Sequence, residues 1–148
     1  MISIFSREDN DAIKDRINKL TPDSRPLWGK MSVSQMVAHL QRPILVSFGE
    51  LKIKRGILGI LFGKMAKRQM LMDKPFKHNM PTVKEFKIAG EDFEKEKNLL
   101  LSYIDRYANK GTQIITKEPH PFFGKMTLEE WDTLQWKHLD HHLRQFGV

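Results

Sequence analysis

The sequence contains no cysteine among its 148 residues and has no long apolar run. The missing cysteine excludes a disulfide framework, a thiolate zinc site and a cysteine nucleophile, so any metal must be bound by His, Asp or Glu. The longest apolar run, residues 57–62 with a glycine inside it, is far too short to span a bilayer. The N-terminal residues turn polar at once, which predicts no signal peptide and a cytoplasmic location.

Strand-forming segments are also scarce. Only residues 112–116 (TQIIT) have β character, and this segment is short. Apolar residues instead recur at helical spacing in four longer segments that begin at capping residues and end near glycine or proline. We therefore expect long helices over 6–20, 32–48, 91–109 and 127–146, with an amphipathic piece at about 57–71.

These segments predict an all-α fold, a four-helix bundle that forms a single domain over residues 1–148. Short links join the first long helix to the second and the third to the fourth. The link between the second and third has roughly 40 residues, which is long enough to cross the bundle and let those two helices run parallel. The expected order is therefore up, down, down, up.

A short repeat marks two of the helix entries. Residues 26–32 (PLWGKMS) and 121–127 (PFFGKMT) share Pro, Gly, Lys and Met at an offset of 95. Each copy ends in a capping residue that is followed three positions later by Gln or Glu, as in a capping box. Two similar helix entries and an ancient duplication of a helical hairpin explain the repeat equally well.

Histidines provide the main candidate for chemistry. His138 and His142 share the apolar face of the last predicted helix, and His141 lies on its border. Two histidines at i and i+4 stand one turn apart on a helix, so both rings can reach one cation. His39 is the only histidine of the second helix, and it meets the other two at one height if these helices are antiparallel with level ends. The three form a candidate metal site.

The same pattern fits a structural role. Partly buried histidines can be satisfied by polar neighbours such as Gln135 and Gln145. If a metal is bound, Gln35 and Gln145 lie on the right arcs to orient the imidazoles, and His141 is an alternative ligand. No carboxylate falls on the histidine face of either helix, so the sequence names no general base.

Three segments resemble a known superfamily: PLWGKMSVSQMVAHL, LGILFGKMAKRQMLMDKPFKHNMPT and the terminal WDTLQWKHLDHHLRQF. Together with the long crossover they are similar to the DinB-like metalloenzyme superfamily, and most similar to a branch described only as a domain of unknown function. The resemblance covers nearly the whole chain, residues 5–147. Its most specific parts are the two helix entries and the terminal HxxxH.

The resemblance implies a divalent metal, zinc or nickel, held by one histidine of the second helix and two of the last, which here are His39, His138 and His142. Some DinB-like proteins transfer low-molecular-weight thiols such as bacillithiol, mycothiol or glutathione, or isomerise their adducts, and many have no established activity. It thus implies a metal-dependent transferase or hydrolase for a small molecule, but whether this chain is an enzyme stays open, because fold does not fix function.

The net charge of +7 lies in one segment. Residues 51–87 hold ten Lys and Arg against two acids, so the rest of the chain is nearly neutral. This segment could make the protein a binding module for an anionic partner. We expect no nucleic-acid binding, because its three aromatics are scattered. We prefer a lid, in which 57–71 packs its apolar face on the bundle. A non-catalytic bundle and a homodimer are further alternatives.

Overall fold

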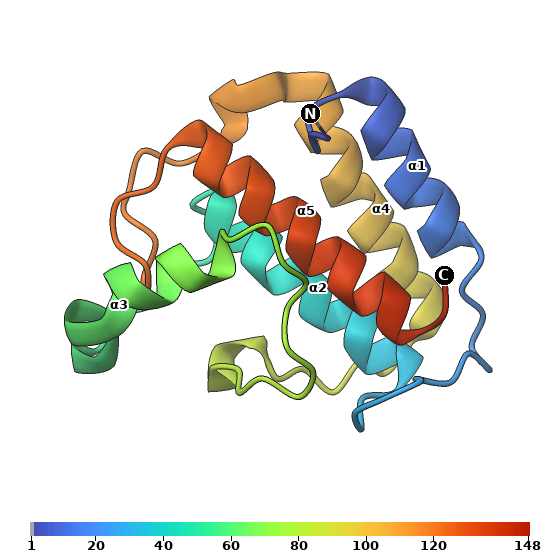
Figure 1. Ribbon diagram of the computed structural model, residues 1–148. Helices are drawn as coiled ribbons and strands as arrows, with labels where there is room; N and C mark the ends of the chain where they lie inside the picture. The colour runs from blue at the N-terminus through green and yellow to red at the C-terminus, as the bar shows by residue number, and fades with distance from the viewer. Residues whose placement is uncertain (1) are drawn as a thin grey trace.

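Residues 2–148, described by a computed structural model, form five α-helices and two 3₁₀ helices and contain no β-strand (Figure 1). α1 and α2 each contact both α4 and α5, whereas α3 projects to one side of them in Figure 1. The predicted all-α class is therefore confirmed. The elements are α1 (Arg7–Asn18), α2 (Val33–Ser47), α3 (Ile57–Met70), η1 (Lys84–Phe86), α4 (Phe93–Lys110), η2 (Gly111–Ile114) and α5 (Leu128–Gln145).

The core lies between α1, α2, α4 and α5. Apolar residues spaced three or four apart on each helix face it, as the sequence pattern predicts. Full burial of each large aliphatic side chain stabilises the fold by about 1.5–3 kcal/mol. The buried residues at this spacing include Ile13, Ile17, Leu20, Val33, Met36, Val37, Leu40, Phe93, Leu100, Ile104, Tyr107, Trp131 and Leu134.

Capping residues fix where the helices begin. The Ser32 hydroxyl accepts a hydrogen bond from the Gln35 backbone N–H, and the Gln35 side chain accepts one from the Ser32 N–H. Thr127 and Glu130 form the same reciprocal pair at the start of α5. Both predicted capping boxes are confirmed. Because each satisfies two N–H groups that the helix leaves without partners, it sets the register of the histidines further along.

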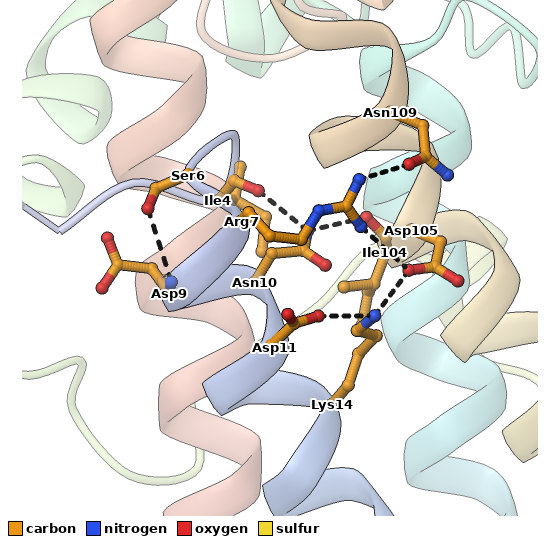
Figure 2. Close-up of polar contacts among 10 residues, drawn as sticks. All are labelled: Ile4, Ser6, Arg7, Asp9, Asn10, Asp11, Lys14, Ile104, Asp105 and Asn109. Carbon is orange, nitrogen blue, oxygen red and sulfur yellow. Dashed lines mark hydrogen bonds and ion pairs between the residues drawn. The ribbon is translucent and has the colours of Figure 1, made fainter.

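A buried asparagine joins α1 to α4. Figure 2 shows Asn10 between the N-terminal segment and α4, where its side-chain amide donates to the carbonyl oxygens of Ile4 and Ile104. Nearby, the Lys14 ammonium lies 2.8 Å from the Asp11 carboxylate and 2.6 Å from the Asp105 carboxylate. Burying an amide is costly unless it is hydrogen-bonded, and here the nitrogen of Asn10 makes both its bonds while its Oδ1 has no partner among residues 2–148, so the two donated bonds favour this pairing of α1 with α4.

The predicted lid is wrong. α3 turns its two buried glycines toward the protein and leaves its large apolar side chains exposed, with Ile57 at 74% exposure. The part of the crossover that does cover the bundle comes later, at η1, which contacts α2. Neither α3 nor another helix within residues 2–148 is long and apolar enough to cross a membrane.

The segment with β character, 112–116, does not form a strand. Its first residues belong to η2, and the backbone N–H of Thr116 donates to the carbonyl of Ser47 at the end of α2. A strand needs a partner to pair its backbone groups. The one β-bridge among the described residues lies elsewhere, between His120 and Gly124. Because the segment has no partner strand, its first residues form a 3₁₀ turn instead.

Candidate metal centre

One histidine of α2 and two of α5 meet between these helices, which are about 100 positions apart in the sequence. One nitrogen from each of His39, His138 and His142 lies within 4.8 Å of the others. Nε2 of His39 is 3.1 Å from Nε2 of His138, and the ring centroids lie 4.8–5.0 Å apart. The structure thus brings together the three residues that the sequence analysis selected as ligands.

Two of the rings are oriented by oxygen acceptors. Nδ1 of His39 lies 3.0 Å from the carbonyl oxygen of Phe86, and Nδ1 of His142 lies 2.8 Å from Oε1 of Gln145. An amide oxygen only accepts, so each neutral ring carries its proton on Nδ1 and leaves the lone pair on Nε2. Without metal, the contact between His39 and His138 is then a hydrogen bond donated by His138.

The Gln145 side chain is itself held in place. Its Nε2 donates to the carbonyl of Trp28 at 2.8 Å, so its oxygen faces His142. Gly29 permits this approach: its φ is +80°, and a Cβ there would lie 2.6 Å from the Gln145 amide nitrogen. The glycine at the matching position of the second repeat, Gly124, also has positive φ, +77°. The repeated entry therefore shares a backbone turn as well as sequence.

Burial keeps the cluster neutral. Removal from water lowers the pKa of His39 despite its hydrogen bond to the Phe86 carbonyl. Burial also lowers the pKa of His142 to about 3. The pKa of His138 is lowered well below its usual range by burial, then by the charges that its histidine neighbours would carry. His138 keeps some accessible surface. Its contacts with two other imidazoles also lower its pKa, because a positive charge on one ring would repel a positive charge on another. Neutral imidazole is the form that binds metals.

His141 faces a different set of side chains. Its ring lies 5.8 Å from that of Trp28, 6.2 Å from His78 and 5.7 Å from Phe76, measured between centroids. Trp28 and His78 stack at 3.9 Å with planes 7° apart. His141 is outside the three-nitrogen group, although its centroid is 5.0 Å from that of His142. These residues form an aromatic wall next to the cluster.

The predicted glutamines have different partners. Gln145 contacts a cluster histidine, as expected. Gln35 caps α2 through Ser32, and the buried Gln135 donates to the carbonyl of Pro43 at 3.3 Å. Within residues 2–148, neither has a hydrogen bond to a histidine, and no carboxylate joins the three-histidine group.

Sequence reasoning missed the backbone and aromatic parts of this site. The Phe86 carbonyl contacts a histidine 47 positions earlier, and a backbone acceptor has no sequence signal. Neither Trp28 nor His78 is among the candidate site residues that the sequence predicts. The stacking of His78 on Trp28 brings the exposed middle of the crossover beside the histidine cluster.

His120 is a buried histidine with a structural role. Its Nδ1 accepts hydrogen bonds from the backbone N–H groups of Phe122 and Phe123 at 3.0 and 3.1 Å, and burial lowers its pKa from 6.5 to about 4. Between about pH 4 and pH 6.5, His120 is therefore protonated in the unfolded chain but neutral in the folded protein. The stability contributed by neutral His120 is therefore complete above about pH 6.5 and is lost as pH falls through about 4.

We expect His120→Asn to remove this pH dependence, because Oδ1 of asparagine can accept the same two hydrogen bonds without titrating. Between pH 7 and pH 4, the unfolding free energy of the wild type should fall by about 3 kcal/mol more than that of the variant. Urea denaturation at both pH values measures it. A difference that does not change with pH would contradict the assignment.

The comparisons with known proteins identify one family. Residues 5–147 match DUF1569, a family described as protein of unknown function. No curated protein and no solved structure matches the chain. The expected resemblance to a branch of unknown function agrees with this match, and the wider relation to DinB-like proteins stays a prediction. Because the match covers nearly the whole chain, the protein belongs to the DUF1569 family.

Proposed function

We propose that His39, His138 and His142 bind one divalent metal ion, zinc or nickel, and that the protein is a metal-dependent enzyme of the DinB-like type. The observation that supports this proposal is the convergence of three histidine nitrogens within 4.8 Å. Two nitrogens bound tetrahedrally to one zinc lie about 3.3 Å apart, and those of His39 and His138 are 3.1 Å apart. The third ring needs to move inward by only about an ångström or two to complete the set.

The surroundings of the histidines fit a metal. The hydrogen bonds at Nδ1 of His39 and His142 fix the tautomer that presents Nε2, as outer partners of metal-binding histidines do. Three protein ligands leave coordination positions open, which is typical of catalytic rather than structural zinc sites. A bound zinc or nickel ion would supply a Lewis acid that lowers the pKa of a water or thiol ligand.

The reaction class that we propose comes from the resemblance to DinB-like proteins, some of which transfer low-molecular-weight thiols. The chain has no cysteine, so such a thiol would have to arrive as a cosubstrate. Hydrolysis of a small molecule is the second option for the same site. The wall of Trp28, His78 and His141 offers apolar and aromatic surface to hold a substrate beside the cluster.

The remaining assignments are proposals of the same kind. The contacts of α1 and α2 with both α4 and α5 support a bundle of four long helices, for which we propose the up, down, down, up order. We also propose a single domain over residues 1–148 and a cytoplasmic location. The competing function is a non-catalytic bundle, and the observation that favours it is the hydrogen bond between His39 and His138, which links these two rings without metal.

Metal titration separates these functions. Tag-free protein, stripped with a chelator and titrated with zinc or nickel in a calorimeter, should bind one equivalent, and His39→Ala should weaken binding more than a hundredfold. His78→Gln removes an exposed histidine outside the cluster and should bind as wild type does. Uptake of neither metal would support the non-catalytic bundle. The metal-loaded protein should then speed the loss of a small thiol in the presence of an electrophile.

A further inference from the structure

The outward face of α3 is a continuous apolar surface. The helix has 14 residues, so it is about 21 Å long. At 100° per residue, the direction opposite its buried glycines is centred on Leu61, with Ile57 and Met65 one turn away on either side. Single exposed apolar side chains are ordinary, but a group of this size on one helix is not. The exposed members are Ile57, Leu58, Ile60, Leu61, Phe62 and Met65.

Two glycines fix which face of α3 points outward. Gly59 and Gly63 are the buried residues of this helix. A Cβ on Gly63 would lie 2.0 Å from the carbonyl oxygen of Phe122, and one on Gly59 would lie 3.1 Å from the same atom. Their spacing of four places both on one face. The helix therefore rests on the loop around Phe122 by backbone contact, and turning its apolar face inward would require side chains where only glycine fits.

Basic residues border the apolar face along one side and at its two ends. Lys54 precedes the helix, Lys64 lies about 60° from Leu61 on the wheel, and Arg68 lies on the same side about 20° from Leu61 but two turns further along the helix. All three are exposed, and none forms an ion pair with residues 2–148. Lys67, on the inner side, pairs instead with Glu130 at 2.8 Å. The cations that border the apolar face thus lack acidic partners within the protein, in a segment of ten basic and two acidic residues.

We propose that α3 binds the surface of an anionic lipid bilayer, lying in the interface with Ile57, Leu61 and Met65 among the acyl chains and Lys64 and Arg68 at the headgroups. A short helix with an exposed apolar face and a Lys- and Arg-rich border is typical of interfacial binding. Long basic side chains extend to the headgroups while their methylene stems stay on apolar surface. The histidine cluster takes no part in this contact.

Charge decides between a membrane and a second copy of the chain. Two α3 helices packed face to face would place the unpaired cations of both copies, Lys54, Lys64 and Arg68, in one interface with no acidic residue of α3 to neutralise them, which is unfavourable. Anionic headgroups complement the same charges, each worth roughly fivefold in membrane partition. Nucleic acid fits less well, because Phe62 is the only aromatic residue in this helix and bases bind by stacking on several aromatics.

Vesicle flotation tests this proposal. Full-length protein should float with phosphatidylglycerol–phosphatidylcholine vesicles and not with phosphatidylcholine alone, and raising the salt should weaken flotation, because salt screens the attraction. Leu61→Glu should reduce partitioning at least tenfold. Leu27→Glu is the matched control, since Leu27 is 71% exposed against 67% for Leu61 and lies in the link between α1 and α2, outside α3. The Leu27→Glu variant carries the same added charge as Leu61→Glu and should float like wild type.

A second pair of variants tests the basic border. Lys64→Glu with Arg68→Glu should abolish flotation, whereas Lys110→Glu with Lys117→Glu, which changes the net charge equally outside the crossover, should reduce it much less. Circular dichroism and metal titration should be unchanged in all variants. The proposal would be overturned if wild type does not float or if both pairs of variants lose flotation equally. It would also be overturned if sedimentation shows a dimer that Leu61→Glu dissociates, because the apolar face would then bind a second copy of the chain.

Discussion

Replacing His138 by alanine should abolish the stabilisation that zinc gives to the wild-type protein. A ligand that binds only the folded state adds about 2.7 kcal/mol at a concentration of 100 times its Kd. Structural zinc sites with four ligands contribute about 10–16 kcal/mol, so one ligand accounts for about 3 kcal/mol, or more than a hundredfold in affinity. Urea unfolding with and without zinc should therefore show a gain for wild type and none for the variant.

Gln145→Leu gives the graded control for this result. Its oxygen accepts from Nδ1 of His142 and its amide nitrogen donates to the Trp28 carbonyl, so the variant keeps all three ligands and loses the side chain that orients one of them. Loss of such a partner costs about 10–100-fold in metal affinity. Zinc should still stabilise this variant, at a higher concentration. If His138→Ala and wild type gain the same stability from zinc, the metal is bound elsewhere and the proposed site is wrong.

Gly90→Ala should destabilise the fold by about 3 kcal/mol or more, through backbone strain and a steric clash. Gly90 has φ +64°, and a Cβ there would lie 2.4 Å from the carbonyl carbon and oxygen of Ser34 and 2.5 Å from the Gln35 nitrogen. These are backbone atoms of the first turn of α2, which cannot move away without disturbing that helix. Urea unfolding monitored by circular dichroism measures the loss.

Gly111→Ala separates the two causes. Gly111 has nearly the same φ, +62°, but no atom lies within 4 Å of an added Cβ. The variant should therefore lose only the cost of a backbone conformation that is nearly confined to glycine (φ +62°, ψ −158°), about 1–3 kcal/mol. If both variants lose the same amount, the close approach of Gly90 to α2 contributes nothing.

The local features of this protein could be predicted from the sequence because they depend on residues a few positions apart. The capping boxes at Ser32 and Thr127 involve a residue and its neighbour three positions on. The pairing of His138 with His142 follows from helix periodicity. Placing His39 with them needed an assumed helix arrangement, and it succeeded because α2 and α5 begin at identifiable caps and pack against each other.

The orientation of α3 was not predictable in the same way. Its apolar residues predict a helix with an apolar face, but the pattern does not say whether that face meets protein or another apolar phase. Gly59 and Gly63 decided it, because only a glycine face can approach the Phe122 backbone so closely. This contact joins segments about 60 positions apart and has no local signal.

The sequence by itself determined an all-helical chain without a thiol, with three histidines as the candidate ligands. The tertiary structure decided what surrounds them: the Phe86 carbonyl at His39, the Gln145 amide at His142 and the stacked wall of Trp28 and His78. Caps and helix faces are set by short-range spacing, which a sequence displays directly. Backbone acceptors and close contacts between distant segments arise only when the helices pack, because packing brings those atoms together.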